Sequence, residues 1–506
     1  MTMTHPGLPL IWSIVILLCM VFLTCQSLVI STQSGNTPFT KSFAEIPAIA
    51  QLVNFMTTSI WPLLVLKIVV TVIFLLIILA GLFGTPIAER NIATVLTWNI
   101  WWAGLIISVF FIGSAWCAVC PWDALATWLV RRKLWKRATP DNSLNLNVPR
   151  WLRNIWPAIF MLIALTWLEL GVGVTTSPYL TSVLALLMVV MATISLAVYE
   201  GKAFCRYFCP VGRTIGFYSQ LAPVELRPID PDICARCTTL ECYHGTETIE
   251  SCPTHLVMGR LKQNTYCVSC GNCTQSCPDH NVAWRLRSYS KEAIQDARPH
   301  WDEAWFMLIL LALTGFHGIS MMPFFETLLG KTAYVINDKG QLLWSFTLLL
   351  FGILLIILLV YICFVYLVKI IKKTDHSYKK LFIEFSFIAL PLAFAYHLAH
   401  NLNHLIREGV NSGYIFSNPF GINAQPLTML EKHMRQMDML IPQQLLFALQ
   451  AGLMVFGFWV AMKIINYRGG TRLGFSNWQL SPMIGYVITI TSFHIWLLSQ
   501  PMIMRL

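Results

Sequence analysis

Eight closely spaced cysteines form the most specific chemical pattern in the sequence. The segment CVSCGNCTQSCP has the spacing C-x2-C-x2-C-x3-C-P that is typical of bacterial 4Fe–4S ferredoxins, and it contains Cys267, Cys270, Cys273 and Cys277. A longer version of the same run lies upstream and contains Cys234, Cys237, Cys242 and Cys252. In two-cluster ferredoxins the last cysteine of such a run ligates the other cluster. We therefore predict two 4Fe–4S clusters, one held by Cys234, Cys237, Cys242 and Cys277 and the other by Cys252, Cys267, Cys270 and Cys273.

Metal binding is the expected use of these cysteines, because they fall in segments predicted to face a reducing cytoplasm, which disfavours structural disulfides. Zinc is the alternative metal for one isolated C-x2-C pair. Two interlocked runs that each end in Cys-Pro favour iron–sulfur clusters over zinc.

Two further cysteine pairs follow apolar runs, at AWCAVCPWDAL and AFCRYFCPVGRTI. Each consists of Ala-aromatic-Cys followed by Cys-Pro, which indicates a weak internal duplication. Neither pair can complete a four-ligand site alone. We predict one shared site at the membrane surface, formed by Cys117, Cys120, Cys205 and Cys209. A third iron–sulfur cluster is favoured there over a thiol–disulfide pair.

Five histidines lie within predicted membrane helices. His397, His400 and His404 have the spacing i, i+3 and i+7, which places them near one face of a helix. His317 and His494 lie at nearly the same depth on two other helices of the same direction. Intramembrane ionisable groups are usually functional, so we predict one polar pocket lined by His317, His397 and His494, with His400 or His404 close behind. Haem b, copper and a quinol head group are the three occupants considered.

Apolar runs must position these residues. Of the 506 residues 56% are hydrophobic and 12% are charged, about half the charged fraction of a soluble protein. About ten runs are long enough to cross a bilayer, at 9–31, 60–84, 94–115, 154–174, 178–199, 303–325, 342–368, 382–406, 442–466 and 481–503. The expected fold is therefore an all-α polytopic membrane protein with a small ferredoxin-like α+β insert.

The net charge of +11 marks topology rather than nucleic-acid binding. Basic residues gather in alternate loops, so the positive-inside rule places these loops in the cytoplasm and both termini outside. The basic segments are 131–137, 200–300, 369–380 and 463–472. We divide the chain into an N-terminal membrane part (1–200), the second Cys-Pro segment (201–224), the ferredoxin insert (225–300) and a C-terminal membrane part (301–506).

The chain resembles the NosR/NapH-type family of membrane polyferredoxins. The resemblance rests on the two Cys-Pro pairs and the eight ferredoxin cysteines and covers about residues 60–300. It implies electron transfer from the quinone pool toward a periplasmic enzyme, or maturation of that enzyme. The first pair reads C-x2-C-P where the family usually has C-x3-C-P, the periplasmic flavin-binding domain of NosR is missing, and the last 200 residues have no counterpart.

The function expected from these features is electron transfer in the bacterial inner membrane. Cytoplasmic-side clusters would exchange electrons with quinone or quinol and an outer-leaflet redox site, and a periplasmic redox enzyme or cytochrome would be the partner. The alternative is a copper-handling or maturation factor that uses the clusters as its electron source. A third hypothesis is an iron–sulfur redox sensor without steady electron flow. No hydrolase triad, P-loop or dinucleotide fingerprint is present.

Overall fold

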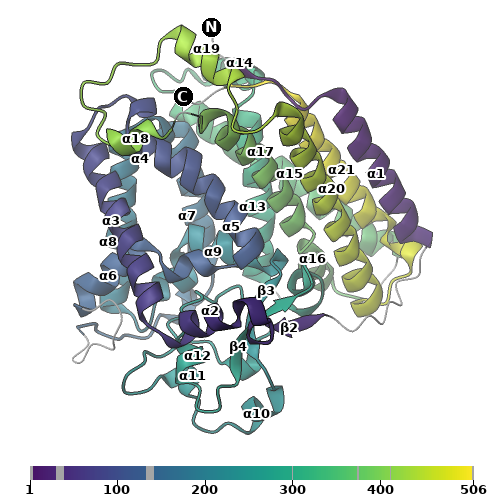
Figure 1. Cartoon of the computed structure of the whole chain (residues 1–506). Coiled ribbons are helices and arrows are strands. Elements are labelled where there is room, and N and C mark those ends of the chain that lie inside the picture. The colour runs from purple at the N-terminus through teal and green to yellow at the C-terminus, as the bar shows by residue number, and fades with distance from the viewer. Residues whose placement is uncertain are drawn as a thin grey trace.

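Long helices run side by side through most of the molecule, and a small domain with a β-sheet hangs from one end of them (Figure 1). The computed structural model describes residues 4–29, 39–132, 142–298, 300–372, 375–410 and 412–503. Part of the basic segment 131–137 lies outside the described residues, as do parts of segment 369–380.

Nine helical stretches among the described residues are long and apolar enough to cross a membrane. They are α1 (Leu10–Val29), α3 (Trp61–Phe83), the continuous α4 (Ile92–Thr94), η3 (Val95–Trp101) and α5 (Trp102–Ile112), α8 (Pro178–Val198), α13 (Trp301–Ser320), α15 (Leu343–Lys372), α16 (Tyr378–Ser386) with α17 (Ala389–Glu408), α20 (Gln443–Ile464) with η12 (Ile465–Arg472), and η13 (Asn477–Leu480) with α21 (Ser481–Ser499).

The run expected at 154–174 differs from the other nine. It forms α7 (Trp156–Trp167) and the π-helical η6 (Leu168–Val172), which together are shorter than the other spans. A left-handed Gly173 ends this helix. The structure therefore confirms a helical multi-pass architecture, with nine long spans in the described residues instead of ten.

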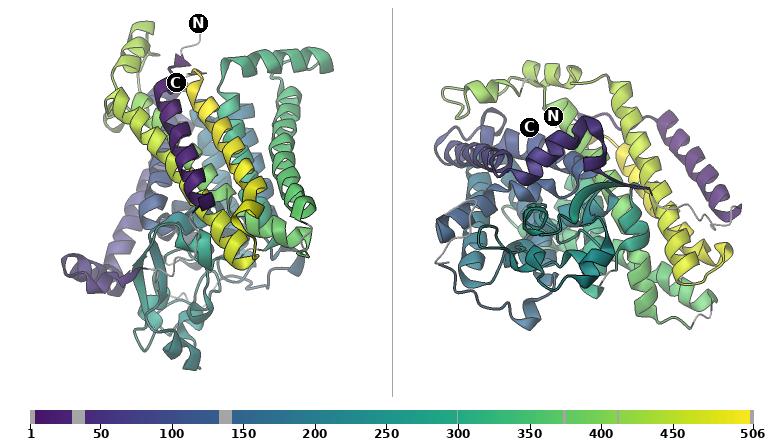
Figure 2. Two further views of the ribbon diagram at one scale, coloured as in Figure 1. Left: turned by 90° about the vertical axis from the view of Figure 1, so that its right-hand side faces the viewer. Right: turned by 60° about the horizontal axis from the view of Figure 1, so that its bottom comes forward.

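The other helices are short and connect the spans. On the side of the sheet these are α2 (Pro47–Thr58), α6 (Pro121–Arg131), α9 (Pro210–Tyr218), α10 (Pro231–Arg236), α11 (Glu241–His244) and α12 (Asn272–Ser276). On the opposite side are α14 (Pro323–Ile336), α18 (Tyr414–Ser417) and α19 (Met429–Met437). Helix α14 fills most of the interval between the runs predicted at 303–325 and 342–368 and lies across the ends of the spans (Figure 2).

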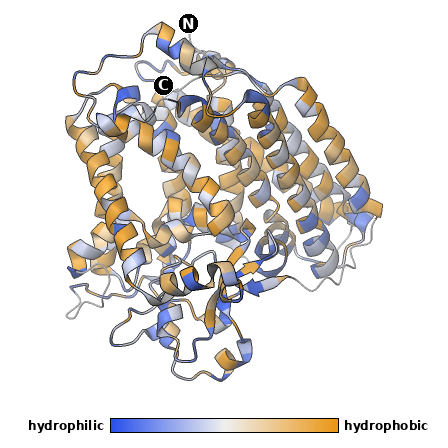
Figure 3. Cartoon of the chain, viewed as in Figure 1, coloured by the Kyte–Doolittle hydropathy of each residue, from blue (hydrophilic) through white to orange (hydrophobic). Residues whose placement is uncertain are grey.

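Central and peripheral spans differ in burial. In α13 and in the α16–α17 stretch 83% of the most apolar window is buried, against 22% in α1, α3 and α15. Many large apolar residues of these peripheral helices are exposed, which water would disfavour and lipid tails accommodate. Their ribbons are mostly in the hydrophobic colour of Figure 3. The peripheral helices therefore face lipid, and α13 and α17 form the centre of the bundle.

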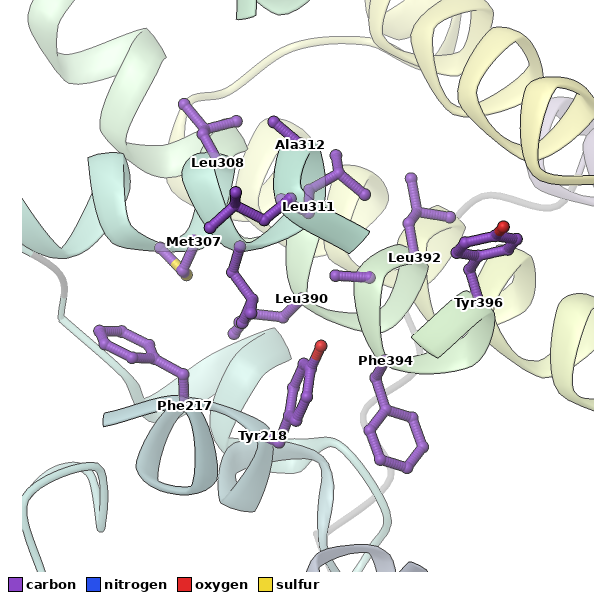
Figure 4. Packing of buried hydrophobic residues seen from close by; sticks show 14 of the residues in the cluster. Phe217, Tyr218, Met307, Leu308, Leu311, Ala312, Leu390, Leu392, Phe394 and Tyr396 are labelled. Carbon is purple, nitrogen blue, oxygen red and sulfur yellow. The ribbon is translucent and has the colours of Figure 1, made fainter. Parts of the chain in front are cut away.

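Short helices also contribute to this centre. Side chains of α9, α13 and α17 interdigitate there (Figure 4). Phe217 stacks on Phe306 at 4.9 Å between ring centroids, and Tyr218 meets the edge of Phe394 at 5.2 Å. The helix that begins directly after Cys209 is thus fixed against the core of the bundle.

The small domain is built on a three-stranded antiparallel sheet in the order β2 (Thr40–Ser42), β4 (Val282–Arg287) and β3 (Val224–Pro228). The first of these strands comes from the segment behind α1, far from the others in sequence. The sequence-based division placed residues 1–200 in the membrane part. In the structure, β2 and the neighbouring α2 complete the insert.

Both termini lie on the face opposite the sheet domain (Figure 2). Strand β1 (Thr4–His5) pairs antiparallel with β5 (Met502–Ile503), so that His5 lies opposite Met502. The ladder places the start of α1 at the same face as the end of α21. The direction of the first span, which its flanking residues leave open, follows from this pairing.

Candidate functional site

Each Cys-Pro pair begins a helix. Cys120 is the N-cap of α6 and Cys209 is the N-cap of α9, with proline at the first helical position in both cases. Proline suits that position because its missing N–H would have no partner in the helix anyway. The amide of Gly212 donates to Cys209 Sγ at 3.2 Å. The free N–H groups and the helix dipole at such an end favour a negatively charged sulfur.

The two pairs converge on one site. Burial raises the pKa of Cys117 well above its usual value, and the neighbouring thiols of Cys120, Cys205 and Cys209 raise it further. Burial likewise raises the pKa of these three thiols to about 12. The duplicated hairpins are joined by an ion pair, because Lys202 Nζ lies 2.6 Å from Asp123 Oδ2. The structure therefore brings together the four cysteines that the sequence assigned to one site.

Four such thiols suit a cationic metal group. Without a cation, burial and mutual repulsion keep them neutral. A bound iron centre supplies the positive charge that makes the thiolate form favourable. The donor set thus fits an iron–sulfur cluster.

The eight cysteines of the sheet domain form two groups. The pKa of Cys234 is raised by burial and by the nearby Cys277 and Cys237. Burial raises the pKa of Cys242, and the nearby Cys234, Cys237 and Cys277 raise it further. A separate small cavity is lined by Cys252, Cys267, Cys270 and Cys273. These two groups of four are the ligand sets that the ferredoxin spacing predicts.

Backbone amides point at several of these sulfurs. Leu256 donates to Cys252 Sγ at 3.3 Å, Ser269 to Cys267 Sγ at 3.4 Å, and Asn281 to Cys277 Sγ at 3.4 Å. Such hydrogen bonds tune the reduction potential of a bound cluster. The sheet domain is therefore suited to two 4Fe–4S clusters.

Direct contacts join the sheet domain to the four-cysteine site. The hydroxyl of Ser114, three residues before Cys117, lies 2.9 Å from that of Ser269, which stands between Cys267 and Cys270. From α9, Arg213 donates to the carbonyl of Thr265 at 2.9 Å. The second ferredoxin group is thus held next to the four-cysteine site.

A cavity of about 370 Å³ is lined mainly by residues of α3, η3, α6, α7 and α8. Its walls are apolar and aromatic. Trp116 and Pro121, the direct neighbours of Cys117 and Cys120, are part of the lining. Three of its tryptophans have buried indole N–H groups with no acceptor among the residues that the structure describes: Trp101, Trp116 and Trp122. We call this space the tryptophan cavity.

A smaller space of about 50 Å³ adjoins the tryptophan cavity and shares Trp102, Leu162, Thr166 and Glu169 with it. His317, His397 and His400 also line this space. His317 Nδ1 lies 3.9 Å from Glu169 Oε1, and the rings of His317 and His400 are 5.0 Å apart. The hydroxyl of Tyr218 and His397 Nδ1 are 3.2 Å apart. Polar groups therefore gather at one wall of an otherwise apolar cavity.

The structure brings His317, His397 and His400 to one space, whereas His494, which was predicted to line the pocket with His317 and His397, lies outside it. His494 stacks on Tyr396 at 4.4 Å and does not line the space occupied by the other three, because the tyrosine ring stands between them. His404 lies beyond His400 and is bonded to Glu408. The space among the imidazoles is also far below the roughly 300 Å³ of ordinary ligand pockets, so these side chains as placed do not fit a haem macrocycle.

Sequence reasoning missed Glu169, the tryptophans and two groups near the termini, His5 and Glu408. A signal for Glu169 was present, since it is the only acidic residue in the apolar run 154–174. The run TWNIWW likewise concentrates aromatic side chains in one stretch. Nothing in the local sequence links His5 to Glu408, because they are 403 residues apart.

Comparison with known proteins supports the cluster assignment. Residues 94–138 and 182–222, which contain both Cys-Pro pairs, match the family described as 4Fe-4S binding domain. The candidate electron transport protein YccM of Escherichia coli (strain K12) is 26% identical over 129 residues. That match covers 25% of this chain and 33% of the length of the relative. No solved structure matches the chain. Together with the spans, these findings support a multi-pass membrane protein that binds 4Fe–4S clusters.

Proposed function

We propose that this protein exchanges electrons between the quinone pool and iron–sulfur clusters, with the quinone head group bound in the tryptophan cavity. The observation that carries the proposal is the position of this cavity. Its wall includes Trp116 and Pro121, the residues next to Cys117 and Cys120, and also Glu169, whose carboxylate lies 3.9 Å from His317 Nδ1 behind it. An occupant would touch the surroundings of a redox centre and a proton acceptor at once.

The lining supports a quinone as the occupant. The cavity volume of about 370 Å³ falls in the usual range for small-molecule sites. A quinone ring and its isoprenoid tail are apolar, apart from two oxygens that accept hydrogen bonds. The unpartnered indole N–H groups of Trp101, Trp116 and Trp122 are donors of the kind those oxygens require. Binding would thus remove the cost of leaving these buried donors without acceptors.

Glu169 and His317 supply the acid–base chemistry. Oxidation of a quinol releases two protons with its two electrons, and reduction of a quinone requires both. The buried carboxylate of Glu169 borders the tryptophan cavity, and His317 lies directly behind it. A carboxylate backed by an imidazole can accept a proton and pass it away from the cavity.

The four-cysteine site and the sheet domain supply the redox groups. We propose that Cys117, Cys120, Cys205 and Cys209 hold a third 4Fe–4S cluster beside the two of the sheet domain. Bound clusters of this type carry one electron at a time. The matched 4Fe-4S family and the contact between Ser114 and Ser269 support this arrangement.

The positive-inside rule supports a bacterial inner-membrane location with the sheet domain in the cytoplasm. The termini, α14 and α19 would then face the periplasm. A periplasmic redox enzyme or cytochrome is the partner we propose on that face.

The test is a single-turnover reaction of the purified, oxidised protein with a short-chain quinol in detergent. The quinol should bleach the visible absorption of the clusters. Glu169→Gln removes the proton acceptor and should slow this reaction at least about 100-fold. Trp116→Phe keeps an aromatic, though smaller, side chain and removes one N–H donor, so the quinol concentration for half-maximal rate should rise about 10-fold.

Two controls separate chemistry from folding. Dithionite, which needs no quinone site, should reduce both variants as fast as the wild type. Glu326→Gln changes an exposed carboxylate on α14 and should behave like the wild type. If the wild type is reduced by dithionite and not by any quinol, the quinone assignment is wrong. An unchanged rate in Glu169→Gln would remove Glu169 from the mechanism.

A further inference from the structure

A buried group of two imidazoles and one carboxylate lies near the two chain ends, apart from the tryptophan cavity. It consists of His5 on β1 with His404 and Glu408 on α17, and its donor atoms all lie within 4.8 Å of one another. Glu408 Oε1 is 2.8 Å from His404 Nδ1 and 3.4 Å from His5 Nε2. No proposed electron-transfer or proton-transfer step uses His5 or Glu408.

We propose that His5, His404 and Glu408 bind a divalent first-row transition-metal ion, with Zn²⁺ the best-matched species. Two imidazole nitrogens and one carboxylate oxygen, with a fourth position open, are a familiar zinc donor set. Tetrahedral zinc with bonds of 2.0–2.1 Å needs donors about 3.4 Å apart. Two of the present separations are 2.8 and 3.4 Å and none exceeds 4.8 Å, so side-chain shifts would bring the three donors to that spacing.

The second observation in favour of a metal is that His5, His404 and Glu408 are buried and that each has a polar atom without a partner among the described residues. The three residues are at most 5% exposed, which makes an uncompensated carboxylate costly. Even so, His5 Nδ1, His404 Nε2 and Glu408 Oε2 have no hydrogen-bond partner in the described part of the chain. A hydrogen-bonded triad that existed only for packing would be expected to satisfy such atoms. A bound cation at the facing atoms would compensate the buried carboxylate, and the cation or its water would provide a partner for Glu408 Oε2.

Local structure explains how these residues meet. His404 and Glu408 are four apart on α17 and therefore project from the same helix face. The ladder of β1 with β5 holds His5 against this face. The nearby Arg407 guanidinium donates to Asn403 Oδ1 at 2.8 Å, and its positive charge favours a water, hydroxide or anion as the fourth ligand.

The metal would also have a structural consequence. It would connect the N-terminal segment to the last turn of α17, while the β1–β5 ladder connects the same segment to the C-terminus. Three segments that are distant in sequence would then be fixed at one point of the face opposite the sheet domain.

The experiment uses full-length protein purified in detergent with a tag that contains no histidine. The protein is treated with a mild chelator, dialysed against Zn²⁺ and analysed for zinc and iron. We expect about one zinc per chain in the wild type. His5→Ala and Glu408→Gln should each weaken zinc binding by at least about 100-fold, since even groups behind the ligands contribute 10–100-fold. Iron content and cluster absorption should stay unchanged in both variants, which shows that the fold is intact.

A matched control removes an imidazole elsewhere. His376, between α15 and α16, contacts the carbonyl of Leu473 on the opposite side of the molecule, so His376→Ala should keep full zinc binding. X-ray absorption of the zinc form should show only nitrogen and oxygen ligands near 2.0–2.1 Å. A wild type that holds no zinc while its iron is complete would overturn the proposal. So would equal zinc in the wild type and in His5→Ala.

Discussion

Each Cys-Pro dipeptide of the four-cysteine site starts a helix and places the cysteine at its N-terminal end. Proline begins α6 and α9, and the cysteine before it takes the N-cap position. The sulfur then lies near the free N–H groups of the first helical turn. The amide of Gly212, for example, donates a hydrogen bond to Cys209 Sγ. Two such helix starts, brought together by Lys202 and Asp123, make a four-thiol site that neither hairpin could form alone.

Loss of one of these thiols should remove one cluster only. Three 4Fe–4S clusters correspond to about twelve iron atoms per chain. Cys205→Ser should lower this to about eight, because the sheet domain keeps its own ligands. Iron analysis together with electron paramagnetic resonance of the reduced protein measures the change.

Cys363→Ser is the matched control, since Cys363 is exposed on α15, far in sequence from the ferredoxin and Cys-Pro motifs. It should retain all the iron. Equal iron content in Cys205→Ser and the wild type would contradict the third cluster.

Among the elements, α9 links the clusters to the bundle. It starts at the four-cysteine site, packs with Phe217 and Tyr218 against α13 and α17, and touches the ferredoxin loop (Figure 4). Contact with that loop depends on Gly216. A Cβ atom there would lie 2.0 Å from the carbonyl oxygen of Thr265, closer than any real contact allows.

Gly216→Ala should therefore separate α9 from the ferredoxin loop. Overpacking of this kind costs about 1–3 kcal/mol, and it outweighs the roughly 1 kcal/mol that alanine gains over glycine within a helix. We expect a lower midpoint of thermal unfolding and faster loss of iron on heating. Gly104→Ala on α5 is the control, because the added Cβ would meet no other described part of the protein within 4 Å beyond its own helix turn, and it should be neutral or slightly stabilising. A Gly216→Ala protein as stable as the wild type would contradict the tight contact.

The whole molecule has two unlike faces. One carries the sheet domain and the start of α16 (Figure 1). The other carries the paired termini, α14 and α19 (Figure 2). Glu169, the imidazoles and the tryptophan cavity lie between these faces.

Fusion reporters test the orientation of these faces. Alkaline phosphatase, which is active only in the periplasm, should be active when fused after Leu506. Green fluorescent protein inserted between Asp375 and His376 should fluoresce, since that loop is expected in the cytoplasm. Exchanging the two reporters should silence both. The opposite result would reverse the orientation and the proposed partners on each face.

Local pattern alone determined a large part of this protein. Hydropathy predicted the helical spans because a bilayer requires some 20 apolar residues in a row. Spacing grouped the ferredoxin cysteines because three ligands of one cluster come from a single tight loop. The duplicated Cys-Pro pairs indicated the four-cysteine site for a similar reason, since each helix start is encoded within a few residues.

Contacts between distant segments lay beyond such patterns. His5 meets Glu408 only because β1 pairs with β5, and β2 joins the insert across more than 200 residues. Glu169 approaches His317 because the helix of α7 and η6 packs against α13. Tyr396 lies between His494 and the other histidines of similar depth. Helical periodicity sets the face and depth of a side chain. Its partner depends on how helices rotate and pack against one another, which is a property of the assembled bundle.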